Sequence, residues 1–283
     1  ISRNGDYTSW YNYLNDPTGH YVGYNSLSDT YEEFFPLPSL VPGGIDYPNI
    51  TSSYTPSVTF LDTGTPEFMF TTSYYGLPYN GDQRSYPGVV SYFGQSSTDY
   101  RPINFAVPAG YTQNDYYIGT SIPHEIFGTG SYIPLVTTTR CTTNVSYTMN
   151  TYIGIYTEDV INGEWNLGAG ESLHEVNVNT IEPTFGPTSD SNFVCWDYNT
   201  HRGVIWVTTS DLGSTNEPIL CFVEYTPSLH TFEVTKLSMN TTVDSGLIAK
   251  MINPKVSEDF SKIVYTGSPV IGHVTLTVAS LNS

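Results

Sequence analysis

The feature that most constrains the fold is a recurring unit of two short apolar runs joined by a polar turn. In each run β-branched or aromatic residues alternate with polar ones, which is typical of half-buried strands. Four such units start at residues 20, 88, 152 and 219, so they recur about every 64 to 68 residues. They cover residues 20–37, 88–107, 152–168 and 219–237, and a fifth run starts at His273.

A second kind of strand–turn–strand unit lies between these. Its examples are residues 56–76, 191–211 and 253–267, with a longer and less regular one at 114–140. Each period then holds four short strands in up-and-down order. No stretch of helical periodicity interrupts them, and 24 Gly and 19 Pro punctuate the chain. Four antiparallel strands in a recurring unit are the pattern of a β-propeller blade.

The sequence therefore predicts an all-β protein: a β-propeller of four to five four-stranded blades forming a single domain over residues 1–283. The predicted repeats are roughly 1–40, 55–108, 114–170, 190–238 and 248–283. Two packed β-sandwich domains are the alternative, because short strands separated by frequent turns also suit sandwiches.

Two segments carry a resemblance to known propellers. VSEDFSKIVYTG, residues 256–267, resembles the first strand–turn–strand of many extracellular and periplasmic propeller repeats. PSVTFLDTGTPEFMFTTS, residues 56–73, is similar to the start of a blade in five-bladed glycan-processing propellers. The resemblance implies an architecture and not an activity.

The two ends of the chain suggest how the ring closes. The first repeat lacks its first strand and the fifth lacks its last, and propellers close when one end completes the blade begun by the other. We expect residues 31–37 to complete the blade formed by residues 250–280. Residues 7–14 are then an extra strand, a wrapping segment, or a strand that pairs with a neighbouring molecule.

The charge of the chain restricts its partners. It has 27 acidic and 9 basic residues, a formal net charge of −18, while only 13% of its residues are charged. A surface of this sign offers no basic patch for phosphates, so nucleic acids and anionic membranes are not expected partners. No run of about 18 apolar residues occurs, so membrane insertion is not expected.

Several features favour an extracellular, secreted protein. Asn49, Asn144 and Asn240 each begin an N-x-S/T sequon, so each is a candidate glycosylation site. A chain rich in Thr, Ser and Asn also produces about two or three sequons by chance. Lys is scarce, Tyr and Thr are abundant, and Ile1 stands in place of Met, so we expect a processed product or fragment.

The three cysteines, Cys141, Cys195 and Cys221, leave at least one thiol without an intramolecular partner. Their spacing fits no zinc site. Cys195 and Cys221 lie in apolar, strand-like runs, so we interpret them as small buried hydrophobic residues.

The candidate catalytic residues are Asp62, Asp197 and Glu258. Propeller glycan hydrolases place an acid/base or nucleophile pair of carboxylates toward the central channel, about 5–10 Å apart. All three residues also lie at turns or strand ends, where a carboxylate commonly accepts hydrogen bonds from nearby backbone N–H groups. No nucleophile elbow, P-loop or dinucleotide motif is present.

No metal site or cofactor is expected from the sequence. The six histidines form none of the usual ligand pairs. His174, with Glu171 and Glu175 beside it, is a weak candidate for a metal site, and a solvated polar strand explains the same residues. The acidic pairs at residues 158–159 and 258–259 offer carboxylates to an ion such as calcium, but they fit turn surfaces equally well.

Aromatic residues are unusually frequent, at 14%, with 24 Tyr. Most of them are expected to fill the space between sheets. Tyrosines in loops rich in Gly and Pro are better candidates for contact with sugars or proteins. The candidate binding residues are Tyr74, Tyr75, Tyr79, Tyr116 and Tyr117.

Taken together, the sequence predicts an extracellular, non-catalytic binding or structural glycoprotein. We expect it to self-assemble into filaments or a surface layer through strand addition at the chain ends. Its expected partners are further copies of itself, other extracellular proteins, or glycans. The alternative from a different class is a glycan-cleaving hydrolase that uses the channel carboxylates.

Overall fold

The computed structural model is an all-β protein built from several sheets. It describes residues 7–12, 20–25, 29–34, 57–62, 66–74, 88–93, 100–102, 106, 108–109, 116–142, 147–181, 188–209, 219–240, 251–270 and 273–282. Most of these residues are in strands, and the one helix among them is the single turn α1 (Val178–Ile181). Within these ranges no helix has the length and apolar character that a membrane crossing requires.

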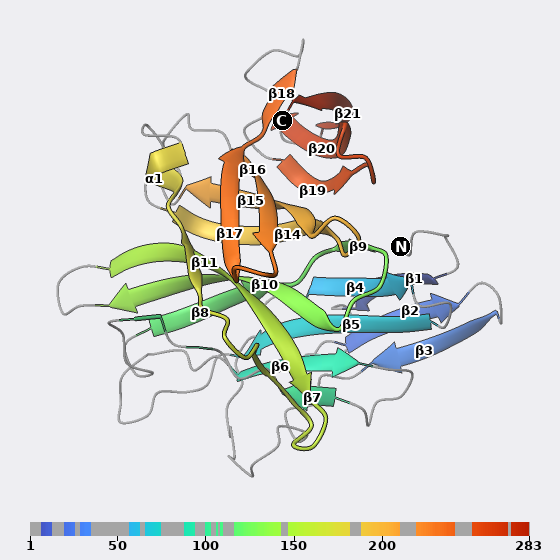
Figure 1. The fold of residues 1–283 in the computed structure, drawn as a ribbon. Helices are drawn as coiled ribbons and strands as arrows, with labels where there is room; N and C mark the ends of the chain where they lie inside the picture. The colour runs from blue at the N-terminus through green and yellow to red at the C-terminus, as the bar shows by residue number, and fades with distance from the viewer. Residues whose placement is uncertain are drawn as a thin grey trace.

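The first two sheets are antiparallel meanders in which chain neighbours are sheet neighbours (Figure 1). Sheet A consists of β1 (Tyr7–Asn12), β2 (His20–Asn25) and β3 (Thr30–Phe34). Sheet B consists of β4 (Ser57–Asp62), β5 (Pro66–Tyr74), β6 (Gly88–Phe93) and β7 (Tyr100–Pro102).

Sheets C and D follow the same order, each with one added short strand. Sheet C contains β8 (Tyr116–Ser121), β10 (Tyr132–Thr142), β11 (Tyr147–Asp159) and β12 (Glu164–Leu167), and β13 (His174–Val176) also pairs with β11. Sheet D contains β14 (Thr188–Asp197), β15 (Arg202–Thr209), β16 (Ile219–Thr226) and β17 (Thr231–Lys236), and β9 (Glu125–Phe127) pairs in parallel with β14.

Sheet E takes its fourth strand from the segment that directly follows sheet D. Its meander is β19 (Met251–Val256), β20 (Lys262–Val270) and β21 (His273–Asn282). The short β18 (Ser238–Asn240) pairs with β21 at the edge of this sheet. Since β17 ends at Lys236, one extended segment pairs first with sheet D and then with sheet E.

The strand–turn–strand pairs expected from the sequence are present. The four units of the first kind form the pairs β2–β3, β6–β7, β11–β12 and β16–β17. Three units of the second kind form β4–β5, β14–β15 and β19–β20. The expected all-β class is therefore confirmed.

The predicted pairing of the chain ends was wrong. Residues 31–37 were expected to complete the last sheet, but β3 pairs with β2 in sheet A, and β18 is the strand beside β21. The run at residues 7–14 contributes β1, which pairs along its whole length with β2. Local hairpin pairing prevails here because it closes a much shorter loop than pairing with residues 250–280 would.

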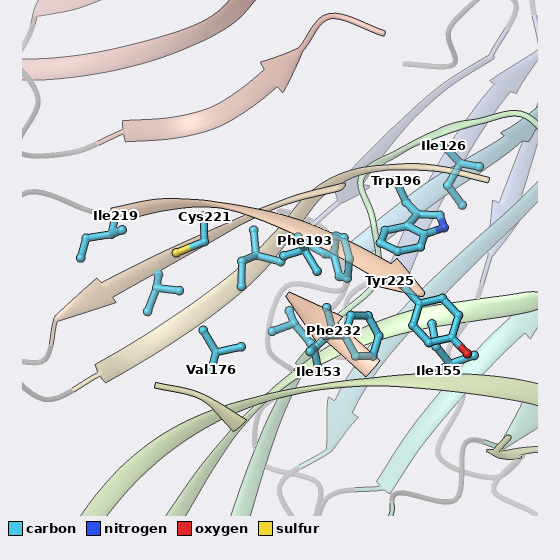
Figure 2. Close-up of a cluster of buried hydrophobic side chains, with 14 of the residues drawn as sticks. Ile126, Ile153, Ile155, Val176, Phe193, Trp196, Ile219, Cys221, Tyr225 and Phe232 are labelled. Atoms are coloured by element: carbon cyan, nitrogen blue, oxygen red, sulfur yellow. The ribbon is translucent and has the colours of Figure 1, made fainter. Parts of the chain in front are cut away.

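Sheet D is buried on both faces. On one face Phe193, Ile205 and Val223 join a cluster that includes Ile153 and Ile155 of sheet C. Figure 2 shows this cluster, with the side chains of sheet D directed toward those of sheet C. Complete burial of one such side chain stabilises a fold by about 1.5–3 kcal/mol, so this layer holds the two sheets together.

The opposite face of sheet D packs against sheet E. Val194, Val204 and Leu220 lie in a second cluster with Val256 and Ile263 of sheet E. Neighbouring residues in a strand point to opposite faces, so both members of the pair Val204–Ile205 are buried.

Sheet C is also buried on both faces. Val136 and Ile155 face sheet D, while Leu135 and Tyr156 belong to a third cluster on the other face. On that side β8 and β12 contact β5 and β7 of sheet B. Sheet C therefore contacts sheets B and D, and sheet D contacts sheet E. Sheet B also contacts sheet D, through β4 and β9.

Candidate functional site

Two hairpin turns of sheet D carry histidines in an uncommon backbone conformation. The turn between β14 and β15 ends at His201, and the turn between β16 and β17 ends at His230, with φ of 55° and 53°. A Cβ at such a left-handed position costs roughly 1–2 kcal/mol, so glycine or asparagine is favoured there. Both histidines instead reach across to sheet C.

Asp197 holds the first of these turns in shape. Its carboxylate accepts hydrogen bonds from the backbone N–H of Asn199 at 2.9 Å and from the hydroxyl of Thr200 at 2.7 Å. The backbone N–H of Tyr225 donates to the carbonyl of His201 at 2.9 Å. The turn is therefore fixed to β16 as well as to its own strands.

Tyr132, the first residue of β10, is the contact of sheet C with this turn. Its hydroxyl lies 2.7 Å from Nδ1 of His201, and its carbonyl accepts a hydrogen bond from the hydroxyl of Tyr198. Its ring meets those of Trp196, Tyr198 and Tyr225 edge to face, with the Tyr198 ring centroid at 5.1 Å. Such pairs add about 0.5–1.5 kcal/mol beyond the area that they bury.

Glu171 is the contact of sheet C with the second turn. It follows a tight turn in which Gly170 has a φ of 82°, and its own N–H donates to the carbonyl of Gly168 at 2.9 Å. Its Oε1 accepts a hydrogen bond from the hydroxyl of Tyr225 at 2.5 Å and lies 2.5 Å from Nδ1 of His230. We refer to the whole group as the seam cluster, which consists of Tyr132, Glu171, Tyr198, His201, Tyr225 and His230.

The tyrosines of the seam cluster stay protonated at neutral pH. Burial raises the pKa of Tyr132 to about 12, and the carboxylates of Asp197 and Glu171 contribute to this rise. Burial, with the hydrogen bond to Glu171, also raises the pKa of Tyr225. Burial likewise raises the pKa of Tyr198. These hydroxyls therefore serve as hydrogen-bond donors between the sheets and not as ionised nucleophiles.

The three predicted catalytic carboxylates lie on three different sheets. Asp62 ends β4 in sheet B, with its side chain outside the described part. Asp197 ends β14 in sheet D, is 6% exposed, and caps a turn. Glu258 lies in the turn between β19 and β20 of sheet E.

The capping residue of that last turn is Asp259 and not Glu258. The hydroxyls of Ser257 and Ser261 and the N–H of Ser261 donate to its carboxylate. These hydrogen bonds lower the pKa of Asp259 to about 2. For both Asp197 and Asp259, bonding to turn residues is the behaviour of a structural carboxylate.

The predicted glycosylation and binding residues are placed only in part. Asn49, Asn144, Tyr75 and Tyr79 lie outside the described residues. Asn240 ends β18, Tyr74 ends β5, and Tyr116 and Tyr117 begin β8, each with its side chain outside the described part.

The residues of the weak metal-site candidate around His174 have separate partners in the described part of the chain. Glu171 contacts Tyr225 and His230, while His174 packs beside Phe232 with ring centroids 6.0 Å apart. Burial lowers the pKa of His174. Across the described ranges no group of three or more His, Cys, Asp or Glu side chains is arranged to hold a metal ion.

Two of the three cysteines behave as buried hydrophobic residues, as predicted. Cys195 and Cys221 are fully buried free thiols in clusters on opposite faces of sheet D. Burial raises the pKa of the Cys221 thiol to about 12 and also raises that of Cys195. Cys141 lies in β10, and its side chain is outside the described part.

Comparison with known proteins adds little. No family model and no curated protein matches the sequence. A solved structure of a BT0996 RGII complex is 11% identical, with a TM-score of 0.43, and the match covers 99% of this protein and 85% of that one. At this identity and score the likeness supports no conclusion about function.

Sequence reasoning missed the seam cluster, apart from Glu171. Its contacts join residues 54 to 69 positions apart, which no local motif reveals. One local signal was present: His201 and His230 stand near the end of hairpin turns where Gly or Asn is usual.

Proposed function

We propose that this chain is an extracellular, non-catalytic binding or structural protein whose sheets are the blades of a β-propeller. The observation that carries the proposal is the burial of both faces of sheets C and D. In a two-sheet sandwich each sheet has one buried and one solvated face. Sheets buried on both faces suit a ring, in which each blade packs between two neighbours.

The contacts between sheets support the same arrangement. The first strand of the sheet D meander, β14, contacts the first strands of sheets C and E, β8 and β19. The last strands also meet, since β12 contacts β7. First strands gathered together and last strands on the outside are what a radial order of blades requires. In this proposal sheet A stands between sheets B and E and closes the ring.

The non-catalytic part of the proposal is supported by the carboxylates. Asp197 is engaged in a turn and is almost completely buried, so it offers no free base to a substrate. Glu258 lies exposed in the turn between β19 and β20, next to the capping residue Asp259. Turnover of an oligosaccharide that is lost in Asp62→Asn would overturn this part.

The extracellular part is supported by the sequons at Asn49, Asn144 and Asn240 and by the acidic, lysine-poor composition. Expression in a secreting eukaryotic cell, followed by enzymatic removal of N-glycans and mass spectrometry, tests it. We expect at least one of the three asparagines to be converted to aspartate. Retention inside the cell with all three unmodified would contradict this part.

Self-assembly is proposed to use the edges of sheet A. Among the described residues this sheet has three strands, with β1 and β3 as its edges. Edge strands present backbone N–H and C=O groups that pair with a further strand. Strand addition by a second copy at β1 or β3 would extend the sheet from one molecule to the next.

Light scattering and electron microscopy of the purified protein test this assembly. We expect species larger than the monomer, and their loss when Thr8 and Ser9 of β1 are both replaced by Lys, since lysines protect sheet edges. The matched control places Lys at Thr231 and Thr235, on the edge strand β17, and keeps the assemblies. A monomer at every concentration would overturn the proposed assembly.

A further inference from the structure

Glu171 is a buried carboxylate in which only one of the two oxygens has hydrogen-bond partners among the described residues. Its side chain is 6% exposed. Oε1 has both Tyr225 and His230 within hydrogen-bond distance, whereas the buried Oε2 has no partner among the described residues. A buried charge is costly unless an opposite charge and hydrogen bonds compensate for it. The compensation available to Glu171 depends on the charge of its neighbours.

His230 is the neighbour that can change its charge. Its side chain is 46% exposed, so solvent reaches its imidazole while Nδ1 faces Glu171. Histidine is the side chain that ordinarily titrates between about pH 5 and pH 8. A hydrogen bond from a protonated imidazole to a carboxylate is roughly twice as strong as a neutral one.

The other titratable groups of the seam cluster do not take this role. Burial keeps the hydroxyls of Tyr132, Tyr198 and Tyr225 protonated, because their pKa values are raised. Asp197 is engaged in its own turn, and His201 contacts the hydroxyl of Tyr132 and not a carboxylate.

Two further groups lie near this region. His174 packs against Phe232, the residue that also contacts the ring of Tyr225. Glu175 interacts electrostatically with His174. Neither has a described contact with the carboxylate of Glu171, so the charge of His230 is the one that bears directly on it.

We propose that Glu171 and His230 form a latch between sheets C and D that tightens in mild acid. Uptake of a proton by His230 supplies the positive charge that the buried carboxylate lacks. The bond between the turn after β12 and the turn between β16 and β17 then becomes an ion pair. This effect is opposite in sign to the usual loss of stability in acid, so it can be distinguished from it.

Hydrogen exchange of the intact protein measures how strongly the latch protects backbone amides in sheet C and in sheet D. The reporters are the amide of Tyr225, bonded to the carbonyl of His201, and the amide of Gly168, bonded to the carbonyl of Ile155. Protection factors are compared at about pH 7.5 and about pH 5.5, because histidines titrate between these values. At the lower pH the latch should contribute about fivefold to the protection of both amides, against the general loss of stability in acid.

Two glutamine variants separate the latch from a general effect of pH. His230→Gln keeps a hydrogen-bond donor but does not titrate, so its protection at the lower pH should fall about fivefold further than that of the wild type. His201→Gln removes the equivalent histidine of the neighbouring turn and should behave as the wild type. Nitrogen-15 shifts of the His230 ring give a second readout: the ring must protonate over the pH range in which the wild type and His230→Gln diverge. The same pH dependence of protection in the wild type and in His230→Gln would overturn the proposal.

Discussion

The partial burial of His124 predicts that the protein loses stability in mild acid. This residue lies between β8 and β9, and its backbone N–H donates to the carbonyl of Phe193 in β14 at 3.1 Å. Burial, and to a smaller extent the charge of Lys255, lowers the pKa of His124 from 6.5 to about 4. The folded state therefore keeps this imidazole neutral at pH values where the unfolded state takes up a proton.

The pKa shift sets the size and the pH window of the effect. The contribution of His124 to stability is fully present above pH 6.5 and is lost as the pH falls toward 4. Each pKa unit corresponds to about 1.36 kcal/mol, so the loss reaches at most about 3 kcal/mol. That is a large part of the roughly 5–15 kcal/mol by which folded proteins are stable.

Urea unfolding, followed by tryptophan fluorescence, measures this loss between about pH 7.5 and about pH 4.5. We compare the wild-type protein with His124→Gln, which keeps a polar side chain and removes the titration. The unfolding free energy of the wild type should fall more steeply with acid, by about 2–3 kcal/mol over this range. Parallel pH profiles for the two proteins would refute the reasoning.

Two further predictions concern the packing of sheet D. In Gly203→Ala the new Cβ would lie 2.6 Å from the carbonyl oxygen of Cys195. The free energy of unfolding should therefore fall by about 1–3 kcal/mol, and the melting temperature with it. An unchanged melting temperature would contradict the placement of β15 on β14. A thiol reagent with peptide mapping should modify Cys195 and Cys221 only after denaturation, because both are buried with raised pKa values. Labelling in the folded protein would contradict their burial.

The strands were predictable because their signal is local. In β16, alternation of residues such as Leu220, Cys221 and Phe222 between two apolar faces gives a continuous apolar run bounded by turn residues. Hairpins follow from such runs because neighbouring strands close short loops. This is why β2–β3 and β16–β17 were found at their positions.

The short strands β9, β13 and β18 were not predictable in the same way. Each has three residues and pairs with a strand that is not its chain neighbour. In β18, the residues Ser238–Asn240 have no apolar alternation of their own. They form a strand because they pair with β21. A pairing between distant segments depends on how the sheets stack, which local patterns do not contain.

Local patterns were also insufficient to predict the roles of the candidate carboxylates. Asp197 was singled out because it is an acid at the end of an apolar strand, and its burial and turn bonds explain that position without catalysis. Glu171 was considered only as a neighbour of His174, three positions along the chain. In the fold its partners are Tyr225 and His230, which sheet D brings from more than 50 positions away.

The left-handed histidines connect the turn chemistry of sheet D with the packing of sheets C and D. Glycine at His201 or His230 would remove a local backbone cost of roughly 1–2 kcal/mol, so the turn alone gives no reason for an imidazole. The reason is the contact with sheet C, where His201 contacts the hydroxyl of Tyr132 and His230 contacts Glu171. A bond to a charged group contributes about 1.5–3 kcal/mol, comparable to the cost that it offsets. Each turn is therefore held in shape by the neighbouring sheet, and the two sheets constrain each other.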